Sequence, residues 1–240
     1  VAAAEVTEED WQPRLSAVGT LVAPQGIFVT NEVSGQVREI HFESGQEVSK
    51  GDLLIQLDDS VDQADLGGLL AQRDLARVKL GRFAKLIKAE LDGAEAAVAA
   101  KQALIAKKRI TAPFDGRLGI RIADLGEYLA PGSQIVPLNA LNPIYADYAL
   151  PERHLPAIDV GQQAVVTVAA YPGREFLSTI SAINPGVEEK TRTVKVRATL
   201  DNAEGLLRPG MFAEVATILP ARQRLLTLPR TAITFAPYGD

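Results

Sequence analysis

The chain carries one pattern of glycine and apolar residues twice, and this repeat constrains the fold more than any other feature. Residues 33–51 read VSGQVREIHFESGQEVSKG, and residues 114–132 read FDGRLGIRIADLGEYLAPG. Three glycine pairs align at a constant separation of 81 residues: Gly35 with Gly116, Gly45 with Gly126, and Gly51 with Gly132. Five apolar pairs keep the same separation: Val33 with Phe114, Val37 with Leu118, Val48 with Leu129, Leu54 with Ile135, and Leu57 with Leu138.

Each copy is typical of short strands joined by tight turns. Glycine supplies the positive φ that such turns need, so we predict that all six aligned glycines occupy turns. A unit of about 30 residues cannot bury its apolar face alone. We therefore predict that the two copies close face to face into one pseudo-symmetric β-sandwich. The alternative is two unrelated hairpins of a larger all-β domain.

The segment between the copies, residues 60–108, is built differently. Glycine and proline become rare, and Ala, Leu and charged residues dominate, which predicts helices. Ser60 and Gln63 have the spacing of a capping box. Asp62 and Asp65 then fall in the first helical turn, where the helix dipole favours negative charge. Capping explains these acidic residues better than a metal site does.

Apolar residues recur in sevens along this segment, which indicates two helices packed along a seam. The predicted seam comprises Leu66, Leu69, Leu80, Phe83, Ile87, Leu91, Val98 and Ile105, with Arg73 as an exception. A short connection implies an antiparallel hairpin. A helix pair inserted between two β halves has little else to pack on, so we expect it to project. The alternative is an ordinary pair of core helices.

The two predicted helices differ in length. The first runs from about Val61 to Ile87, roughly 40 Å, and the second from about Lys88 to Lys107, roughly 30 Å. No turn residue marks the junction. We therefore predict that about ten residues, including the hairpin tip, are missing near residues 87–88. The candidate hinges at the base of the hairpin are Asp58, Asp59, Ser60, Lys108, Arg109 and Ile110.

The chain returns to β patterns after Leu141. Val194, Val196, Ala198 and Leu200 alternate with polar residues, and 162–170, 175–183 and 211–219 are further strand candidates. Pro-Gly and Glu-Gly dipeptides mark the turns. Strands at this spacing predict a small closed barrel or a sandwich over 142–221, to which 11–27 adds a strand.

The sequence offers no catalytic or metal-binding constellation. His41 and His154 lack partners at metal-ligand spacing, Met211 is the only methionine, and Gly-rich phosphate loops and nucleophile motifs are absent. The net charge is −5 with no basic run, which argues against nucleic acid as a partner. There are no cysteines, which fits an oxidising compartment. We expect no enzymatic activity, no cofactor and no metal.

The two glycine-rich copies resemble the halves of a split lipoyl (biotinyl-like) domain. In that family the carrier lysine sits at the hairpin that joins the halves. Here the junction reads Leu57-Asp58-Asp59-Ser60, without a lysine. A lipoyl-like carrier subunit is therefore a disfavoured alternative.

The whole order of segments resembles the periplasmic adaptors, or membrane fusion proteins, of RND-type tripartite efflux pumps. The residues that carry this resemblance are 33–37 (VSGQV), 45–51 (GQEVSKG), 111–116 (TAPFDG) and 207–212 (LRPGMF). It implies a mainly β, elongated, multidomain protein. Its parts are a split lipoyl-like domain at 28–59 and 109–141, a helical hairpin at 60–108, a β-barrel, and a truncated membrane-proximal β domain at 1–10 and 222–240.

The resemblance also implies a function and partners. The expected role is structural coupling in the periplasm, anchored to the inner membrane by a part not in this chain. The implied partners are an inner-membrane RND transporter, an outer-membrane channel of the TolC type, and further copies of the chain in a ring. An adaptor of an ABC-type exporter is the nearest alternative.

Overall fold

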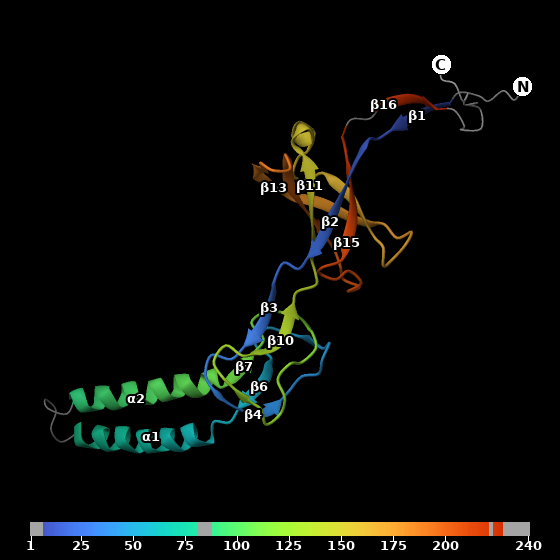
Figure 1. Ribbon diagram of the computed structural model, residues 1–240. Coiled ribbons are helices and arrows are strands. Elements are labelled where there is room, and N and C mark those ends of the chain that lie inside the picture. The colour runs from blue at the N-terminus through green and yellow to red at the C-terminus, as the bar shows by residue number, and fades with distance from the viewer. Residues whose placement is uncertain (1–6, 81–87, 221–222, 228–240) are drawn as a thin grey trace, which may run out of the picture. The chain divides into compact units, whose positions relative to one another are not determined.

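A computed structural model of the 240-residue chain describes residues 7–80, 88–220 and 223–227 (Figure 1). The chain folds into two compact units. One unit is formed by Gln25–Ala140, and the other combines Val1–Pro24 with Leu141–Asp240.

The unit of residues 25–140 contains two four-stranded sheets with one core. Their strand orders are β7-β6-β4-β9 and β3-β10-β8-β5. The strands are β3 (Gly26–Thr30), β4 (Gly35–Ile40), β5 (Glu47–Val48), β6 (Leu53–Leu57), β7 (Arg109–Thr111), β8 (Gly116–Leu118), β9 (Tyr128–Leu129) and β10 (Gln134–Asn139).

The sequence repeat reappears as a structural repeat. Strands β4, β5 and β6 begin 81 residues before β8, β9 and β10. Each half lends a strand to the other half's sheet, in the same register: β5 pairs with β8, where Val48 faces Gly116, and β9 pairs with β4, where Leu129 faces Gly35. Both sheets contain strands of both halves, so the two copies close around each other in a split sandwich, as predicted.

The aligned apolar residues form the core between the sheets. Val37, Leu54 and Leu57 are buried together with their equivalents Leu118, Ile135 and Leu138. Burial of one such side chain contributes about 1.5–3 kcal/mol relative to leaving it in water. The core therefore depends equally on both copies.

The six aligned glycines have two different roles. Gly45, Gly51, Gly126 and Gly132 adopt positive φ, between 82° and 94°. Gly35 and Gly116 do not occupy turns, so that part of the prediction is wrong: they begin β4 and β8. A Cβ on Gly116 would lie 2.6 Å from the Asn139 carbonyl oxygen, so close packing excludes a side chain there.

The hairpin leaves the sandwich between β6 and β7 (Figure 1). Helix α1 (Ser60–Leu80) has 21 residues and α2 (Lys88–Lys107) has 20. The predicted difference in helix length and the predicted break next to Lys88 both depend on residues 81–87, which lie outside the described residues. Neither helix is both long and apolar enough to span a membrane.

The other unit contains a closed six-stranded barrel. Strand β2 (Arg14–Val22) closes it by pairing with both β11 (Ile144–Pro151) and β15 (Phe212–Ile218). The remaining strands are β12 (Gln163–Val168), β13 (Phe176–Glu188) and β14 (Thr193–Leu200), and η1 (Glu152–Ala157) is a short 3₁₀ helix. The sequence had left a barrel or a sandwich open, and the pairing of β2 on both edges makes it a barrel.

Two further strands pair near the ends of the described chain. Strand β1 (Thr7–Trp11) runs antiparallel to β16 (Gln223–Thr227), from Thr7 opposite Thr227 to Trp11 opposite Gln223. The barrel strand β2 is therefore shorter at both ends than the predicted segment 11–27. Trp11 belongs to β1, and Gly26 already pairs with Asn139 of β10 in the sandwich.

Candidate functional site: the base of the helical hairpin

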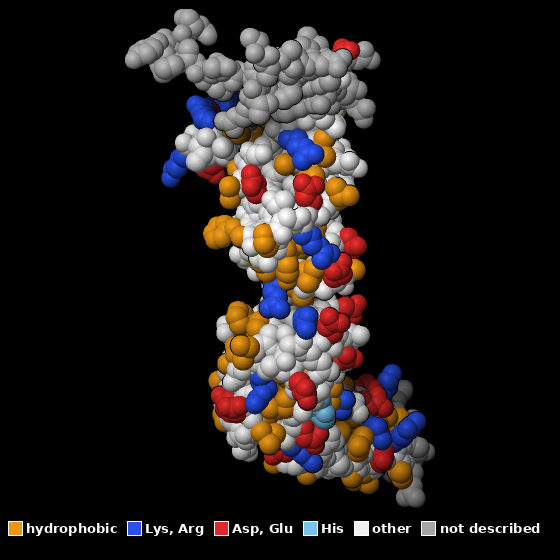
Figure 2. Space-filling model, turned by 90° about the vertical axis from the view of Figure 1, so that its right-hand side faces the viewer, with side chains coloured by type: hydrophobic (Ala, Val, Ile, Leu, Met, Phe, Trp, Pro, Cys, Tyr) orange, Lys and Arg blue, Asp and Glu red, His pale blue; other side chains and the backbone are white. Residues whose placement is uncertain are grey.

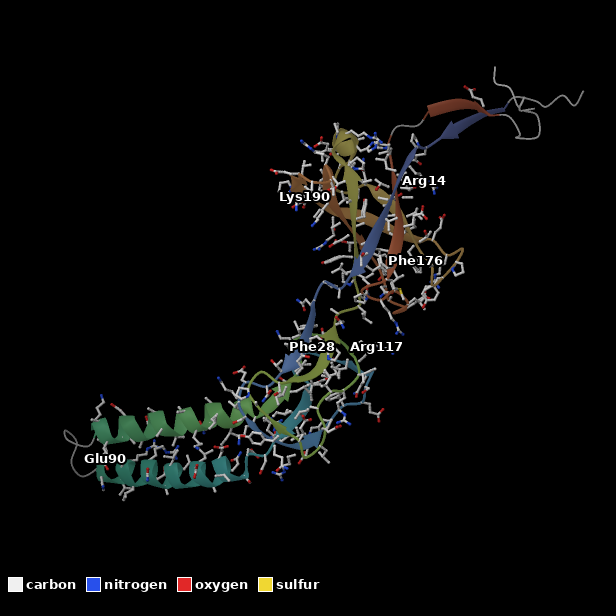
Figure 3. All side chains as sticks on the ribbon, in the orientation of Figure 1. Arg14, Phe28, Glu90, Arg117, Phe176 and Lys190 are labelled. Carbon is white, nitrogen blue, oxygen red and sulfur yellow. The ribbon has the colours of Figure 1, made fainter. Side chains whose placement is uncertain are left out.

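The two helices pack along the predicted seam. Leu91 and Val98 are buried, and Leu66, Leu69, Leu80 and Ile105 are half-buried. Phe83 and Ile87 lie outside the described residues. Arg73, the exception in the heptad pattern, turns to Asp74, with Nη2 2.7 Å from Oδ1. The antiparallel register is visible at the far end of the hairpin, where Lys79 Nζ lies 3.4 Å from Oε1 of Glu90 (Figure 3).

The first turn of α1 is bonded to Asp59, one residue before the predicted N-cap Ser60. Gln63 donates from its backbone N–H to the Asp59 carbonyl, 2.9 Å away, and from Nε2 to Asp59 Oδ2, also at 2.9 Å. Ser60 donates its backbone N–H to Asp58 Oδ1 at 3.1 Å instead of capping the helix. Asp59 therefore accepts the first helical hydrogen bond, and the Gln63 side chain reaches Asp59 instead of Ser60 as the predicted capping box required.

A cluster of opposite charges closes the base of the hairpin. We call Asp62, Asp65, Lys101 and Lys108 the basal cluster. The two oxygens of Asp62 accept from both lysines, at 3.2 Å from Lys101 and 2.5 Å from Lys108. Lys101 also donates to Asp65 at 3.0 Å. The side chains of Asp62 and Lys108 are only 12% and 13% exposed, so this part of the cluster is largely withdrawn from water.

Lys108 ties the hairpin to the sandwich as well. Its Nζ donates to the Asp58 carbonyl at 2.7 Å, and its own carbonyl accepts the backbone N–H of Leu57 at 2.9 Å. One lysine therefore joins the start of α1, the end of α2 and the last residue of β6. The sequence pattern predicts a capping role for Asp62 and a hinge at Lys108, but it does not indicate that the two residues pair.

The basal cluster favours its charged state. The hydrogen bond from Lys108 holds the pKa of Asp62 below its ordinary value. The hydrogen bonds to Asp65 and then Asp62 raise the pKa of Lys101. A backbone hydrogen bond from Ser60 lowers the pKa of Asp58. The shifts of Asp62 and Lys101 both favour the charged forms that make the ion pairs of the cluster near neutral pH, whereas the Asp58 shift reflects hydrogen bonding at the start of α1.

The candidate hinges do not all occupy flexible connections. Arg109 and Ile110 lie in β7 and pair with Gln56 and Ile55 of β6. Ile110 is 6% exposed and belongs to the sandwich core. The hinge assignment is therefore wrong for these two residues, because bending there would break ladder bonds and open the core. Asp58 and Asp59 lie between β6 and α1, and Ser60 is the first residue of α1.

The histidines and acidic residues make no catalytic arrangement in the described part of the chain. His41 Nε2 lies 3.2 Å from Glu39 Oε2, and His154 accepts from Arg153 on an exposed surface. Among residues 7–80, 88–220 and 223–227, no three potential metal-ligating side chains converge.

The barrel wall carries a charge pair that the sequence did not reveal. Arg197 on β14 binds both oxygens of Asp147 on β11, each at 2.7 Å, and its guanidinium lies 4.8 Å from the Tyr145 ring centroid. Register brings these residues together, because Asp147 is directly opposite Arg197. The pair points outward from the barrel and fixes the alignment of two neighbouring strands.

Two family models match the chain in tandem. The RND MFP barrel-sandwich hybrid domain matches residues 26–137, and the CusB-like beta-barrel domain matches residues 143–220. The chain belongs to the RND membrane fusion proteins. The first match coincides with the repeat and its inserted hairpin, and the second with the closed barrel.

Two curated relatives are similar to this membrane fusion protein over its whole length. An uncharacterised protein of Haemophilus influenzae is 32% identical, across the whole chain and 66% of that protein. The multidrug resistance protein MdtA of Yersinia pestis is 30% identical, across the whole chain and 63% of its length. The chain thus spans just under two thirds of these relatives.

Solved structures share the fold of this membrane fusion protein. A MacA-MexA chimeric protein that contains the Pseudomonas aeruginosa MexA α-hairpin domain matches with a TM-score of 0.79 at 21% identity, over 94% of this chain and 87% of that one. ZneB from Cupriavidus metallidurans matches with a TM-score of 0.59 at 21% identity, over 87% of this chain and 99% of that one.

Proposed function

We propose that this protein is a periplasmic adaptor that links an inner-membrane RND transporter to an outer-membrane channel of the TolC type during efflux of small molecules. It works without catalysis, associates with the inner membrane and assembles into a ring. The observation that carries the proposal is the helical hairpin, which is inserted between two interlocked β halves. The multidrug resistance protein MdtA, similar over the whole chain, supports the efflux role.

The basal cluster gives the hairpin its mechanical role. Because Lys108 joins both helices to β6, a force on the hairpin reaches the sandwich directly. Asp58, Asp59, Ser60 and Lys108 remain the proposed hinge residues, and the contacts of Lys108 limit how far the hairpin tilts there. Coupling is thus geometric, since a large tilt of the hairpin carries the sandwich with it.

The proposed contact with the outer-membrane channel is the hairpin tip. The alignment to MdtA extends over 281 positions although this chain has 240 residues, so that relative carries additional residues opposite gaps in this chain. We propose that part of this excess lengthens the hairpin tip, and sequencing of the full-length gene across the codons for residues 80–90 tests whether tip residues are missing from this chain.

Complementation of efflux tests the function. The full-length gene, expressed in a strain that lacks its own adaptor, is expected to restore drug export and to co-purify with an RND transporter. A matched control gene with residues 60–108 replaced by a short Gly-Ser linker should lack this effect while keeping the barrel. Failure of the full-length gene to restore export with any RND transporter of the same host contradicts the proposal.

A further inference from the structure

A hollow of about 720 Å³ lies on the outer wall of the barrel. Its lining comes from five neighbouring strands, β15, β2, β11, β14 and β13, which all belong to one compact unit. Three of the outward-facing side chains in this lining are small, namely Thr20, Ala149 and Ala182, so the wall is low there. The volume lies within the range of small-molecule sites in proteins, about 300–1,000 Å³.

An irregularity in β13 contributes one side of the hollow. Strand β13 pairs with β14 at Ile183 and Val196 and next at Val187 and Val194, so β13 advances by four residues while β14 advances by two. A strand with extra residues bends away from its partner. Asn184 lies in this bulge and lines the hollow. Bulges of this kind are frequent beside functional sites.

Two large apolar side chains line the same hollow. Val18 on β2 and Phe212 on β15 are 73% and 76% exposed. Single exposed apolar groups are ordinary on protein surfaces, and Figure 2 shows hydrophobic side chains interspersed with charged ones on one face of the molecule. Val18 and Phe212 differ from such groups because they lie together in a concave site, where a ligand with an apolar body can cover both.

The lining also carries an excess of positive charge. Lys195 and Arg197 on β14 face one acidic side chain, Asp147. Asp147 takes Nε and Nη2 of Arg197, and the guanidinium has further N–H donors at Nη1. Because Asp147 and the Tyr145 ring hold the guanidinium in place, these donors keep a fixed direction. Lys195 projects from the same face of β14 and is exposed, so an anionic group is favoured here.

We propose that this hollow binds a small amphipathic anion, with one carboxylate or sulfonate group on an apolar body. The anionic group lies between Lys195 and Nη1 of Arg197. The apolar body lies over the small side chains of the wall, against Val18 and Phe212. The site is built by the barrel alone, so the inference goes beyond the proposed adaptor role.

Two fluorescent probes with the same aromatic body test the site. Anilinonaphthalene sulfonate carries an anionic group, phenylnaphthylamine lacks it, and both become brighter in apolar surroundings. Each probe is titrated into the full chain and into matched variants. The sulfonate should respond to changes in charge and in apolar lining, whereas the amine should respond to the apolar lining alone.

Lys195→Gln tests the anionic part of the site. Lys195 is exposed, so this variant should fold normally, which thermal unfolding checks. It is expected to weaken binding of the sulfonate about fivefold to tenfold, as loss of a charge-assisted hydrogen bond does, and to leave the amine unchanged. Lys190→Gln removes the same charge from the exposed β13–β14 turn (Figure 3) and should change neither affinity.

Two further variants test the apolar part. Phe212→Ser is expected to weaken both probes about fivefold to tenfold, because the apolar body loses a large contact. Ala149→Phe fills the hollow from an exposed position and should abolish binding of both probes. Leu177→Ser is the control, because Leu177 is 72% exposed on β13 and lies outside the lining.

The outcomes decide between this site and general surface binding. Sulfonate binding that is unchanged in Lys195→Gln contradicts the anionic class of ligand. Binding that survives Ala149→Phe, or an equal loss in Lys190→Gln or Leu177→Ser, overturns the site itself. The titrations involve neither the transporter nor the channel, so their failure does not bear on complementation of efflux, and failed complementation does not bear on them.

Discussion

The two halves of the sandwich share a core but differ in what they carry at their ends. After Leu57 the first half continues through Asp58 and Asp59 into α1, which carries Asp62 and Asp65 of the basal cluster. After Leu138, its equivalent, the second half continues to β11 of the barrel. The comparison shows that the repeat supplies the scaffold, and that the departures from the repeat locate the functional parts.

The largest expected effect tests the equivalence of the two cores. Leu57→Ala and Leu138→Ala both empty a site that is 0% exposed. Each should lower the free energy of unfolding by about 2–5 kcal/mol, because a cavity remains. Urea unfolding measures both. Because the sheets exchange strands, each variant should unfold in one transition for the whole sandwich; separate transitions for the two halves would contradict the interlocked core.

A smaller difference is expected at the first glycine of each half. A Cβ on Gly116 meets the Asn139 backbone at 2.6 Å, whereas on Gly35 it meets the Leu57 side chain at 3.2 Å. Gly116→Ala should therefore lower the free energy of unfolding by about 2–3 kcal/mol, because the Asn139 backbone cannot move aside. Gly35→Ala should lower it by about 1 kcal/mol, because the Leu57 side chain can adjust. Equal losses in thermal or urea unfolding would mean that the two close approaches are equivalent.

The basal cluster has no counterpart in the second half, where Pro143 occupies the position equivalent to Asp62. Asp62→Asn should destabilise the hairpin by about 1–2 kcal/mol, since Lys108 loses its carboxylate partner while Lys101 keeps Asp65. Hydrogen exchange of the amides in α1 and α2 measures this local loss. Asp65→Asn is the matched control with a smaller effect, because the Asp65 side chain is 56% exposed.

The loss of stability caused by Asp62→Asn should depend on pH. Because the pKa of Asp62 is lowered in the folded protein, its stabilisation is present above the ordinary aspartate pKa of about 3.9 and is lost as pH falls through the lower folded value. The stability difference between wild type and Asp62→Asn should therefore be constant from pH 7 to about pH 5 and shrink below about pH 4. A difference that stays constant at pH 3 would exclude the charge pair as its source.

The smallest expected effect is a gain in stability in α1. Gly67 and Gly68 lie inside the helix, and a Cβ on either would meet nothing within 4 Å. Gly67→Ala should stabilise the hairpin by up to about 1 kcal/mol through helix propensity alone. Slower amide exchange in α1 would show this gain, with Gly45→Ala as a contrasting loss because Gly45 requires positive φ.

Pattern alone predicted the repeat, the helical insertion and the strand-rich remainder. The helical seam was also predictable, because heptad spacing places Leu91 and Val98 on one face. The pairing of Asp62 with Lys101 and Lys108 was not, although Asp62 precedes the seam residue Leu69 by one heptad. That spacing indicated that Asp62 faces the second helix. It could not identify the lysine that pairs with Asp62, because this depends on how the two helices are aligned across 39 or more residues of sequence.

Glycine turns and apolar periodicity are local properties, so the order of residues was enough to predict two equivalent β units with one shared core and a helix pair between them. Three features came from the folded structure: each half lends a strand to the other's sheet, β2 closes the barrel, and Lys108 fixes the hairpin to β6. These features depend on register between distant segments, which no local pattern encodes.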